Sequence, residues 1–175
     1  MNFLASLRAG LASVQPVVAG FVLFLLSGTL LFWPGHRVRQ PITFDHAKHI
    51  KAGAGCTDCH SGAQDQSHAT LPQVSTCLMC HESALTTSKE EAKIRTVAAS
   101  GKELEWSQVT RVAPHVYFSH RRHVGVAKVD CAVCHGDMAM ATSPPTRRFR
   151  PLNMNDCLAC HEQHKVKSDC NDCHR

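Results

Sequence analysis

The chain has 175 residues, with ten cysteines, thirteen histidines and a formal net charge of +5. Aromatic residues make up only 6% of it, too few for side chains alone to build an ordinary packed core, so a bound group is expected to fill the interior. The charge is mild, and no dense run of Lys and Arg is interleaved with aromatic residues, which argues against nucleic-acid binding.

The first predicted element is a membrane anchor. Residues 17–33 are apolar or small and carry no charge, a length that can cross a bilayer. The alternative is a cleaved signal peptide, which has a shorter apolar stretch and a cleavage site flanked by small residues. Because the stretch ends in Trp33 followed by Pro34, an interfacial tryptophan and a helix stop fit better. Residues 2–14, with apolar side chains at helical spacing, are expected to lie along the inner surface or to pack against a neighbouring membrane subunit; the alternative is that they extend the span.

An aromatic residue followed by two histidines occurs twice, as residues 44–49 (FDHAKH) and residues 118–123 (FSHRRH). Each F-x-H-x-x-H element precedes a cysteine motif by a few residues. Histidines three apart share one side of a helical turn but point somewhat apart. We therefore predict an internal repeat in which each element supplies ligands to two metal centres.

All ten cysteines fall into five C-x-x-C-H motifs. In this motif two thiols on one helical turn bond the two vinyl groups of one haem, and the adjacent histidine ligates the iron. We number the motifs sites 1 to 5 in chain order. Their residues are Cys56, Cys59 and His60; Cys77, Cys80 and His81; Cys131, Cys134 and His135; Cys157, Cys160 and His161; and Cys170, Cys173 and His174. The sequence predicts five covalently bound haems c.

Zinc and disulfides are the alternatives to haem. Structural zinc does not require a histidine after every second cysteine, and redox C-x-x-C motifs occur singly at a strand–helix junction that is not evident here.

Charge does not fix the orientation of the anchor, since Arg8 precedes it and Arg37 and Arg39 follow it. Haem thioethers are assembled outside the cytoplasm. We therefore predict a cytoplasmic N-terminal segment and anchor over residues 1–35 and an exported pentahaem domain over residues 36–175.

Between the two halves, residues 88–95 (SKEEAKIR) are predicted to form a linking helix with a solvated face. Ser88 is the expected N-cap, with Glu91 three residues on as in a capping box. Elsewhere prolines break the chain into short turns and no strand-like alternation is sustained. The predicted fold is mostly irregular, with short α-helices wrapped around haems and one N-terminal transmembrane helix.

Eight histidines remain outside the motifs: His36, His46, His49, His68, His115, His120, His123 and His164. Five irons need only five distal ligands, so the chain has more histidines outside the motifs than the irons require. This favours six-coordinate electron-transfer haems over open ones. His36, beside Arg37, is expected to be a surface residue.

The F-x-H-x-x-H elements resemble those of the class III multihaem cytochromes, small proteins whose irons carry two histidines. The resemblance covers residues 118–175 well and residues 44–81 in part. It implies that the first histidine of an element serves the next haem and the second a later one. The implied pairs are His46 with His60, His49 with His81, His120 with His135, and His123 with His161.

The resemblance leaves the distal ligand of site 5 open. In that family a further histidine stands just before the middle motif of the three-haem unit, where this chain has Met154. Carried over, Met154 would ligate the haem of site 5, and its thioether would raise that haem's potential. The alternative is that Met154 packs on a porphyrin face and His68, His115 or His164 is the ligand.

The N-terminal anchor with five motifs, together with residues 72–81 and 106–120, resembles the pentahaem cytochrome subunits of bacterial alternative complex III. The resemblance implies electron transfer in a quinol-oxidising complex of the inner membrane, with the haems on the periplasmic side. The implied partners are an iron–sulfur subunit, a polytopic quinol-binding subunit and a monohaem cytochrome c. A related pentahaem subunit of another complex is the alternative.

Three functions are compatible with the residues. A pure electron conduit needs no open iron, and catalysis by this chain alone is then not expected. A multihaem reductase needs a vacant coordination position with donors nearby, yet the chain has one tyrosine, Tyr117. A single-anchor quinol dehydrogenase differs from the conduit only in its partner.

Overall fold

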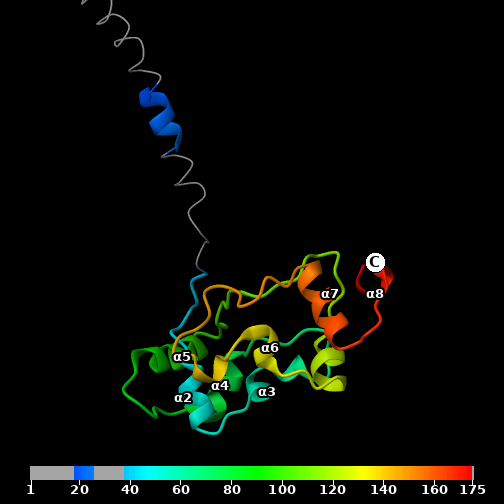
Figure 1. Ribbon diagram of the computed structural model, residues 1–175. Helices are drawn as coiled ribbons and strands as arrows, with labels where there is room; N and C mark the ends of the chain where they lie inside the picture. Colours follow the sequence, from blue (N-terminus) through cyan, green and yellow to red (C-terminus); the bar gives the residue numbers. More distant parts are fainter. Residues whose placement is uncertain (1–17, 26–37, 175) are drawn as a thin grey trace, which may run out of the picture. The chain divides into compact units, whose positions relative to one another are not determined.

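The computed structural model describes residues 18–25 and 38–174. The chain divides into two units, Met1–His36 and Arg37–Arg175. In the first unit residues 18–25 are helical and their side chains are exposed (Figure 1). Most of the predicted anchor, residues 17–33, and all of residues 2–14 lie outside the described residues. Among those that are described, no helix has both the length and the apolar character needed to span a bilayer.

The second unit consists of short helices joined by loops (Figure 1). The α-helices are α2 (His46–Lys51), α3 (Cys56–Cys59), α4 (Val74–His81), α5 (Lys89–Ala99), α6 (Cys131–His135), α7 (Met154–Gln163) and α8 (Cys170–Cys173). Two 3₁₀-helices, η1 (Ser61–Ala63) and η3 (Met138–Met140), and a π-helix, η2 (Arg121–Val126), complete the set. The described residues contain no strand, only an isolated bridge between Val116 and His174. The predicted combination of short helices and loops is confirmed.

Each cysteine motif lies on a short helix, and a polar side chain caps the start of α6 and of α7. The side chain of Asp130 accepts from the backbone N–H of Ala132 at the start of α6, and that of Asn153 accepts from the backbone N–H of Asp156 at the start of α7. Such caps satisfy backbone donors that have no partner within the helix. One or two turns suffice, because a motif needs only to present two thiols and one imidazole on neighbouring positions.

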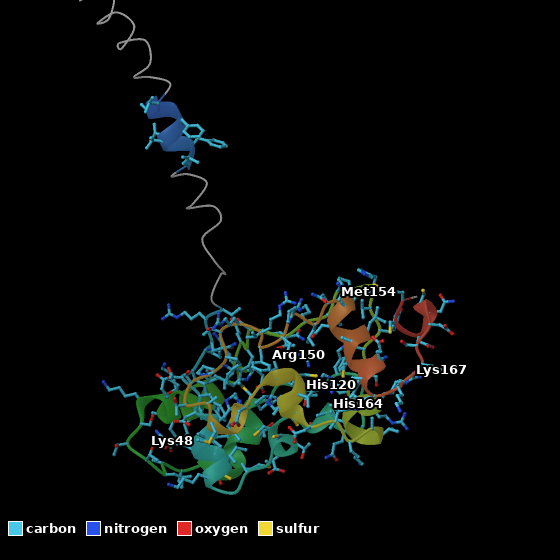
Figure 2. The ribbon with its side chains drawn as sticks, viewed as in Figure 1. Lys48, His120, Arg150, Met154, His164 and Lys167 are labelled. Carbon is cyan, nitrogen blue, oxygen red and sulfur yellow. The ribbon has the colours of Figure 1, made fainter. Side chains whose placement is uncertain are left out.

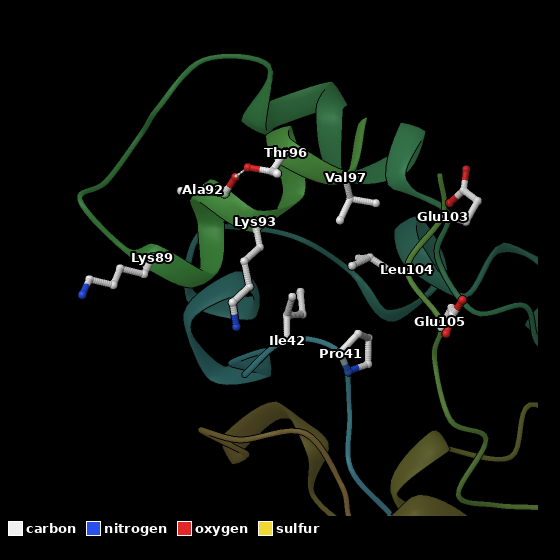
Figure 3. A pocket seen from close by; sticks show the side chains of 10 residues that line it. All are labelled: Pro41, Ile42, Lys89, Ala92, Lys93, Thr96, Val97, Glu103, Leu104 and Glu105. Atoms are coloured by element: carbon white, nitrogen blue, oxygen red, sulfur yellow. Dashed lines mark hydrogen bonds between the residues drawn. The ribbon is translucent and has the colours of Figure 1, made fainter. Parts of the chain in front are cut away.

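The buried hydrophobic cluster lies where α4 packs against α5. Its members are Ile42, Val74, Ile94 and Leu104. Trp106 packs against it and its indole N–H donates to the carbonyl of Pro72 at 2.9 Å. A pocket of about 410 Å³ opens at the edge of this cluster, between α5 and the segments that carry Ile42 and Leu104 (Figure 3).

Outside this cluster the side chains bury little. Ala63 is the one other buried hydrophobic residue in the described part of the chain. A domain of this size normally buries most of its apolar side chains. The packing therefore agrees with the composition, which predicts that a bound group contributes to the interior.

Helix α5 differs from its prediction on one side. Ser88 is the N-cap as expected, and its hydroxyl accepts from the N–H of Glu90 at 3.3 Å. The predicted capping box does not form, because the carboxylate of Glu91 turns to the backbone N–H groups of Leu85 and Thr86. Glu91 is only 7% exposed, so this side of the helix is not solvated.

A close backbone approach joins the two repeats. The N–H groups of His120 and Arg121 donate to the carbonyls of Ser67 and Gln66, at 3.0 and 2.8 Å, which places η2 beside the loop after η1. Gly125 permits this approach, since a Cβ at that position would lie 2.0 Å from the carbonyl oxygen of Gln64.

The substitution Gly125→Ala should therefore force η2 away from the loop after η1. We expect it to lower the free energy of unfolding by about 1–3 kcal/mol, the usual cost of overpacking, measured by guanidinium denaturation. Gly55→Ala is the matched control, because a Cβ there meets nothing closer than 3.5 Å. Equal stabilities for the two variants would contradict the close approach.

Candidate haem-binding sites

Each motif histidine lies near a second histidine from a distant part of the chain. The distances between ring centroids are 6.1 Å for His49 and His81, 6.4 Å for His120 and His135, 6.1 Å for His123 and His161, and 5.4 Å for His115 and His174. His46 is the neighbour of the remaining motif histidine, His60: burial lowers the pKa of His46, and His60 lowers it further. Four sites thus have a facing imidazole, and in site 1 His46 lies near His60.

These spacings suit an iron held between two imidazoles. A metal–nitrogen bond of about 2.0 Å on each side, plus the distance from nitrogen to ring centre, separates the two centroids by roughly 6 Å. Elsewhere in the described part of the chain, metal-ligating side chains do not gather in groups of three or more. The donor set consists of imidazole pairs, and it fits six-coordinate haem.

Hydrogen bonds fix which imidazole nitrogen is free. The Nδ1 atoms of His49, His60 and His123 lie 2.7, 2.7 and 2.9 Å from the backbone carbonyls of residues 45, 70 and 119. A carbonyl only accepts, so each Nδ1 carries the hydrogen and Nε2 keeps its lone pair. This is the tautomer that binds a metal through Nε2.

The phenylalanine of each F-x-H-x-x-H element orients both histidines. Phe44 stacks on His49 with centroids 4.3 Å apart and meets His46 edge-on at 4.8 Å. In the second repeat Phe118 stacks on His123 at 4.6 Å and meets His120 edge-on at 4.9 Å. The same aromatic geometry in both repeats directs the two imidazoles of an element to different sites.

The cysteines are arranged as thioether attachment requires. All ten thiols are free and lie at exposed or half-buried positions. Apolar residues within the motifs, Met79, Val133 and Leu158, are likewise 40% exposed or more. Thiols and apolar side chains on the same surface offer both the attachment points and the contact area that a porphyrin needs.

Sites 1, 3 and 4 are neighbours in space. Burial raises the pKa of the Cys131 thiol in site 3, and the nearby Cys56 of site 1 adds to the shift. Arg150 joins sites 3 and 4, donating to the carbonyl of Val133 on α6 at 3.3 Å and forming an ion pair with Asp156 on α7. Figure 2 places Arg150 between these helices.

Sites 2 and 5 lie at opposite ends of this row. Burial raises the pKa of Cys77 in site 2, and Cys59 of site 1 adds to the shift. Burial and Asp156 raise the pKa of Cys157 in site 4, and Cys173 of site 5 adds to that shift. From these proximities, and from the succession of α4, α6, α7 and α8 across Figure 1, we infer that the order of the sites in space is 2–1–3–4–5, which differs from their order in the sequence.

The backbone brings His115 to site 5. The isolated bridge pairs Val116 with His174, and the N–H of Tyr117 donates to the carbonyl of Cys173 at 2.8 Å. The ring of His115 consequently lies 5.4 Å from that of His174, with an angle of 18° between the planes.

Exposure does not separate the candidates for site 5, since His115 and the other three are all exposed, but His115 is the one whose ring lies beside that of His174. Met154 begins α7 with 61% of its surface exposed, and His164 ends the same helix (Figure 2). His68 is exposed and its Nδ1 lies 2.9 Å from the hydroxyl of Ser67. His36 lies outside the described residues. The geometry favours His115, the ligand candidate that the class III resemblance did not select.

Two comparisons with known proteins relate the chain to multihaem cytochromes c. Residues 116–175, which contain sites 3 to 5, match the family described as cytochrome c7 and related cytochrome c. The chain is also 31% identical to the "Menaquinone reductase, multiheme cytochrome c subunit" of Nitratidesulfovibrio vulgaris, over 88% of this chain and 83% of that protein. The predicted c-type haem and electron-transfer class are thereby supported.

Proposed function

The chain belongs to the multihaem cytochrome c family of the menaquinone reductase subunit, and from that premise we propose that it passes electrons along five haems c within a membrane complex that exchanges electrons with quinone. The observation that carries the proposal is the second imidazole that faces four of the motif histidines and lies near the fifth, His60. Each bound haem supplies an iron that takes up and releases one electron. The chain provides the attachment, the axial ligands and the spacing.

The proposed axial pairs are those brought together in space: His46 with His60, His49 with His81, His120 with His135, His123 with His161, and His115 with His174. Two imidazoles at every iron leave no position for a substrate. This supports a conduit over a multihaem reductase. The proposed pairs assign His115 rather than Met154 to the iron of site 5, so that all five irons have the same ligand type.

The 2–1–3–4–5 order gives the conduit two ends. Site 2 lies beside the α4–α5 cluster, and site 5 is carried by the C-terminal helix α8. With about 28 residues per haem, neighbouring sites are held close together. We propose that one end meets the electron donor and the other the acceptor.

The uncharged residues 17–33 are the proposed membrane anchor, with the haem domain on the outer side of the inner membrane. The name of the relative favours flow toward menaquinone. The resemblance to alternative complex III favours flow from quinol, to a monohaem cytochrome c, alongside an iron–sulfur and a polytopic subunit. The relative and the resemblance assign the same electron-transfer role to this chain and differ in the direction of electron flow.

The haem count tests the cofactor assignment. Pyridine haemochrome analysis of the purified chain should give five haems c, because every cysteine belongs to a motif. The variant Cys170→Ala/Cys173→Ala should give four, with a mass lower by one haem. A wild-type count of three or fewer would contradict the proposal.

The ligand of site 5 is tested by opening it. His115→Leu should let the reduced protein bind carbon monoxide at one haem of five, since removing an imidazole frees a coordination position. Met154→Leu is the matched control and should bind none, as should the wild type. Carbon monoxide binding by Met154→Leu but not by His115→Leu would restore methionine as the ligand.

The direction of electron flow is tested with the membrane complex purified intact. Mixing the chemically reduced complex with a menaquinone analogue should oxidise its haems if the chain serves quinone reduction. Mixing the oxidised complex with the corresponding quinol should reduce them if it serves quinol oxidation. If the haems change redox state in neither experiment, the proposed electron exchange with quinone is wrong.

A further inference from the structure

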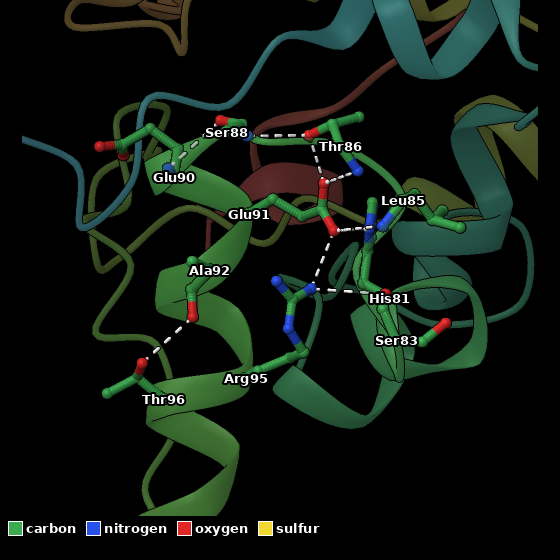
Figure 4. A network of polar contacts seen from close by, with 10 residues as sticks. All are labelled: His81, Ser83, Leu85, Thr86, Ser88, Glu90, Glu91, Ala92, Arg95 and Thr96. Carbon is green, nitrogen blue, oxygen red and sulfur yellow. Dashed lines mark hydrogen bonds and ion pairs between the residues drawn. The ribbon is translucent and has the colours of Figure 1, made fainter.

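A buried carboxylate lies beside the motif histidine of site 2. Helix α5 packs on α4, and this contact brings Glu91 to the end of α4, where His81 is located (Figure 4). The Oε1 atom of Glu91 lies 3.5 Å from Nδ1 of His81. The side chains of both residues are largely shielded from solvent, at 6% and 17% exposure.

The Nδ1 atom of His81 is buried and forms no hydrogen bond. Its separation of 3.5 Å from Oε1 of Glu91 is that of an ion pair. In site 1 the corresponding nitrogen of His60 lies 2.7 Å from the neutral carbonyl of Thr70. The two motif histidines thus face different acceptors, one a backbone dipole and the other a carboxylate.

Glu91 is held as an anion. Its carboxylate accepts hydrogen bonds from the Thr86 hydroxyl, from the Leu85 N–H and from Arg95. Arg95 donates to Oε1 at 2.8 Å, so one cation compensates the charge in part. A carboxylate with this many donors does not depend on the histidine for its own stability. Its presence beside Nδ1 therefore needs another explanation.

Resting on the proposed function, we propose that Glu91 is a positioning residue of site 2, which accepts the Nδ1 hydrogen of His81 and thereby lowers the reduction potential of the haem bound there. An imidazole that donates to a carboxylate becomes a stronger electron donor to its metal. A buried negative charge also stabilises ferric over ferrous iron. Both effects act in the same direction.

A lower potential at site 2 matters because of where that site lies. In the 2–1–3–4–5 order it is an end of the row, and its neighbour, site 1, has a neutral carbonyl in place of the carboxylate. An electron arriving at site 2 would then move readily to the interior sites. Glu91 thereby marks site 2 as the end at which electrons enter.

The test is a redox titration of the holoprotein that carries all five haems, with the haems assigned by paramagnetic NMR. Glu91→Gln should raise the midpoint potential of the site 2 haem and leave the other four close to their wild-type values. Glu90→Gln is the matched control: it is the adjacent residue of the same helix, but its carboxylate pairs with Lys93 and the N–H of Thr43. It should shift none.

A second variant tests the opposite direction. Arg95→Met removes the cation beside Glu91 and should lower the potential at site 2, and it decides the matter if Glu91→Gln fails to mature. If Glu91 serves only to hold residues 85 and 86, its variant would lose stability while all potentials stayed unchanged, which would overturn the inference. A haem count of three or fewer in the wild type would instead overturn the proposed function, so the two failures are distinct.

Discussion

The arrangement of this domain depends on pairs of imidazoles that face each other across the space of one iron. Each pair joins a histidine of a C-x-x-C-H motif to one from a different segment, as when the stretch from His115 to His123 reaches sites 3, 4 and 5. Because few side chains are buried outside the α4–α5 cluster, these pairs, once joined by iron, would add strong long-range links to the backbone contacts of the haem domain. Haem binding and folding are on this account one process, since each metal bond also closes a long loop.

The motifs and their helices could be predicted from the sequence because their chemistry is local. Two cysteines and a histidine on one turn determine both the cofactor and the helix, and Asp130 and Asn153 supply the caps that start α6 and α7. The F-x-H-x-x-H elements could be recognised by their repetition. Their phenylalanines had no assigned role, although an aromatic residue two positions before a histidine could have indicated ring packing.

Contacts between distant residues could not be predicted in this way. His115 reaches site 5 through a single bridge between Val116 and His174. No alternation of hydrophobic residues in the sequence predicts this bridge. The order 2–1–3–4–5 depends on the approach of η2 to the loop after η1, where Gly125 takes part. Glu91 fits a capping box by spacing, yet the packing of α5 on α4 offers its carboxylate better donors at residues 85 and 86. Tertiary contacts overrode a correct local pattern in that case.

The central claim is that five irons lie between five histidine pairs, in the order 2–1–3–4–5. Anomalous diffraction at the iron edge, from crystals of the haem-loaded protein, tests this most directly. The account predicts five iron peaks, each between the two imidazoles of one pair, with the site 1 iron between those of sites 2 and 3. An iron ligated outside its pair, or a site 1 iron at the end of the row, would contradict it.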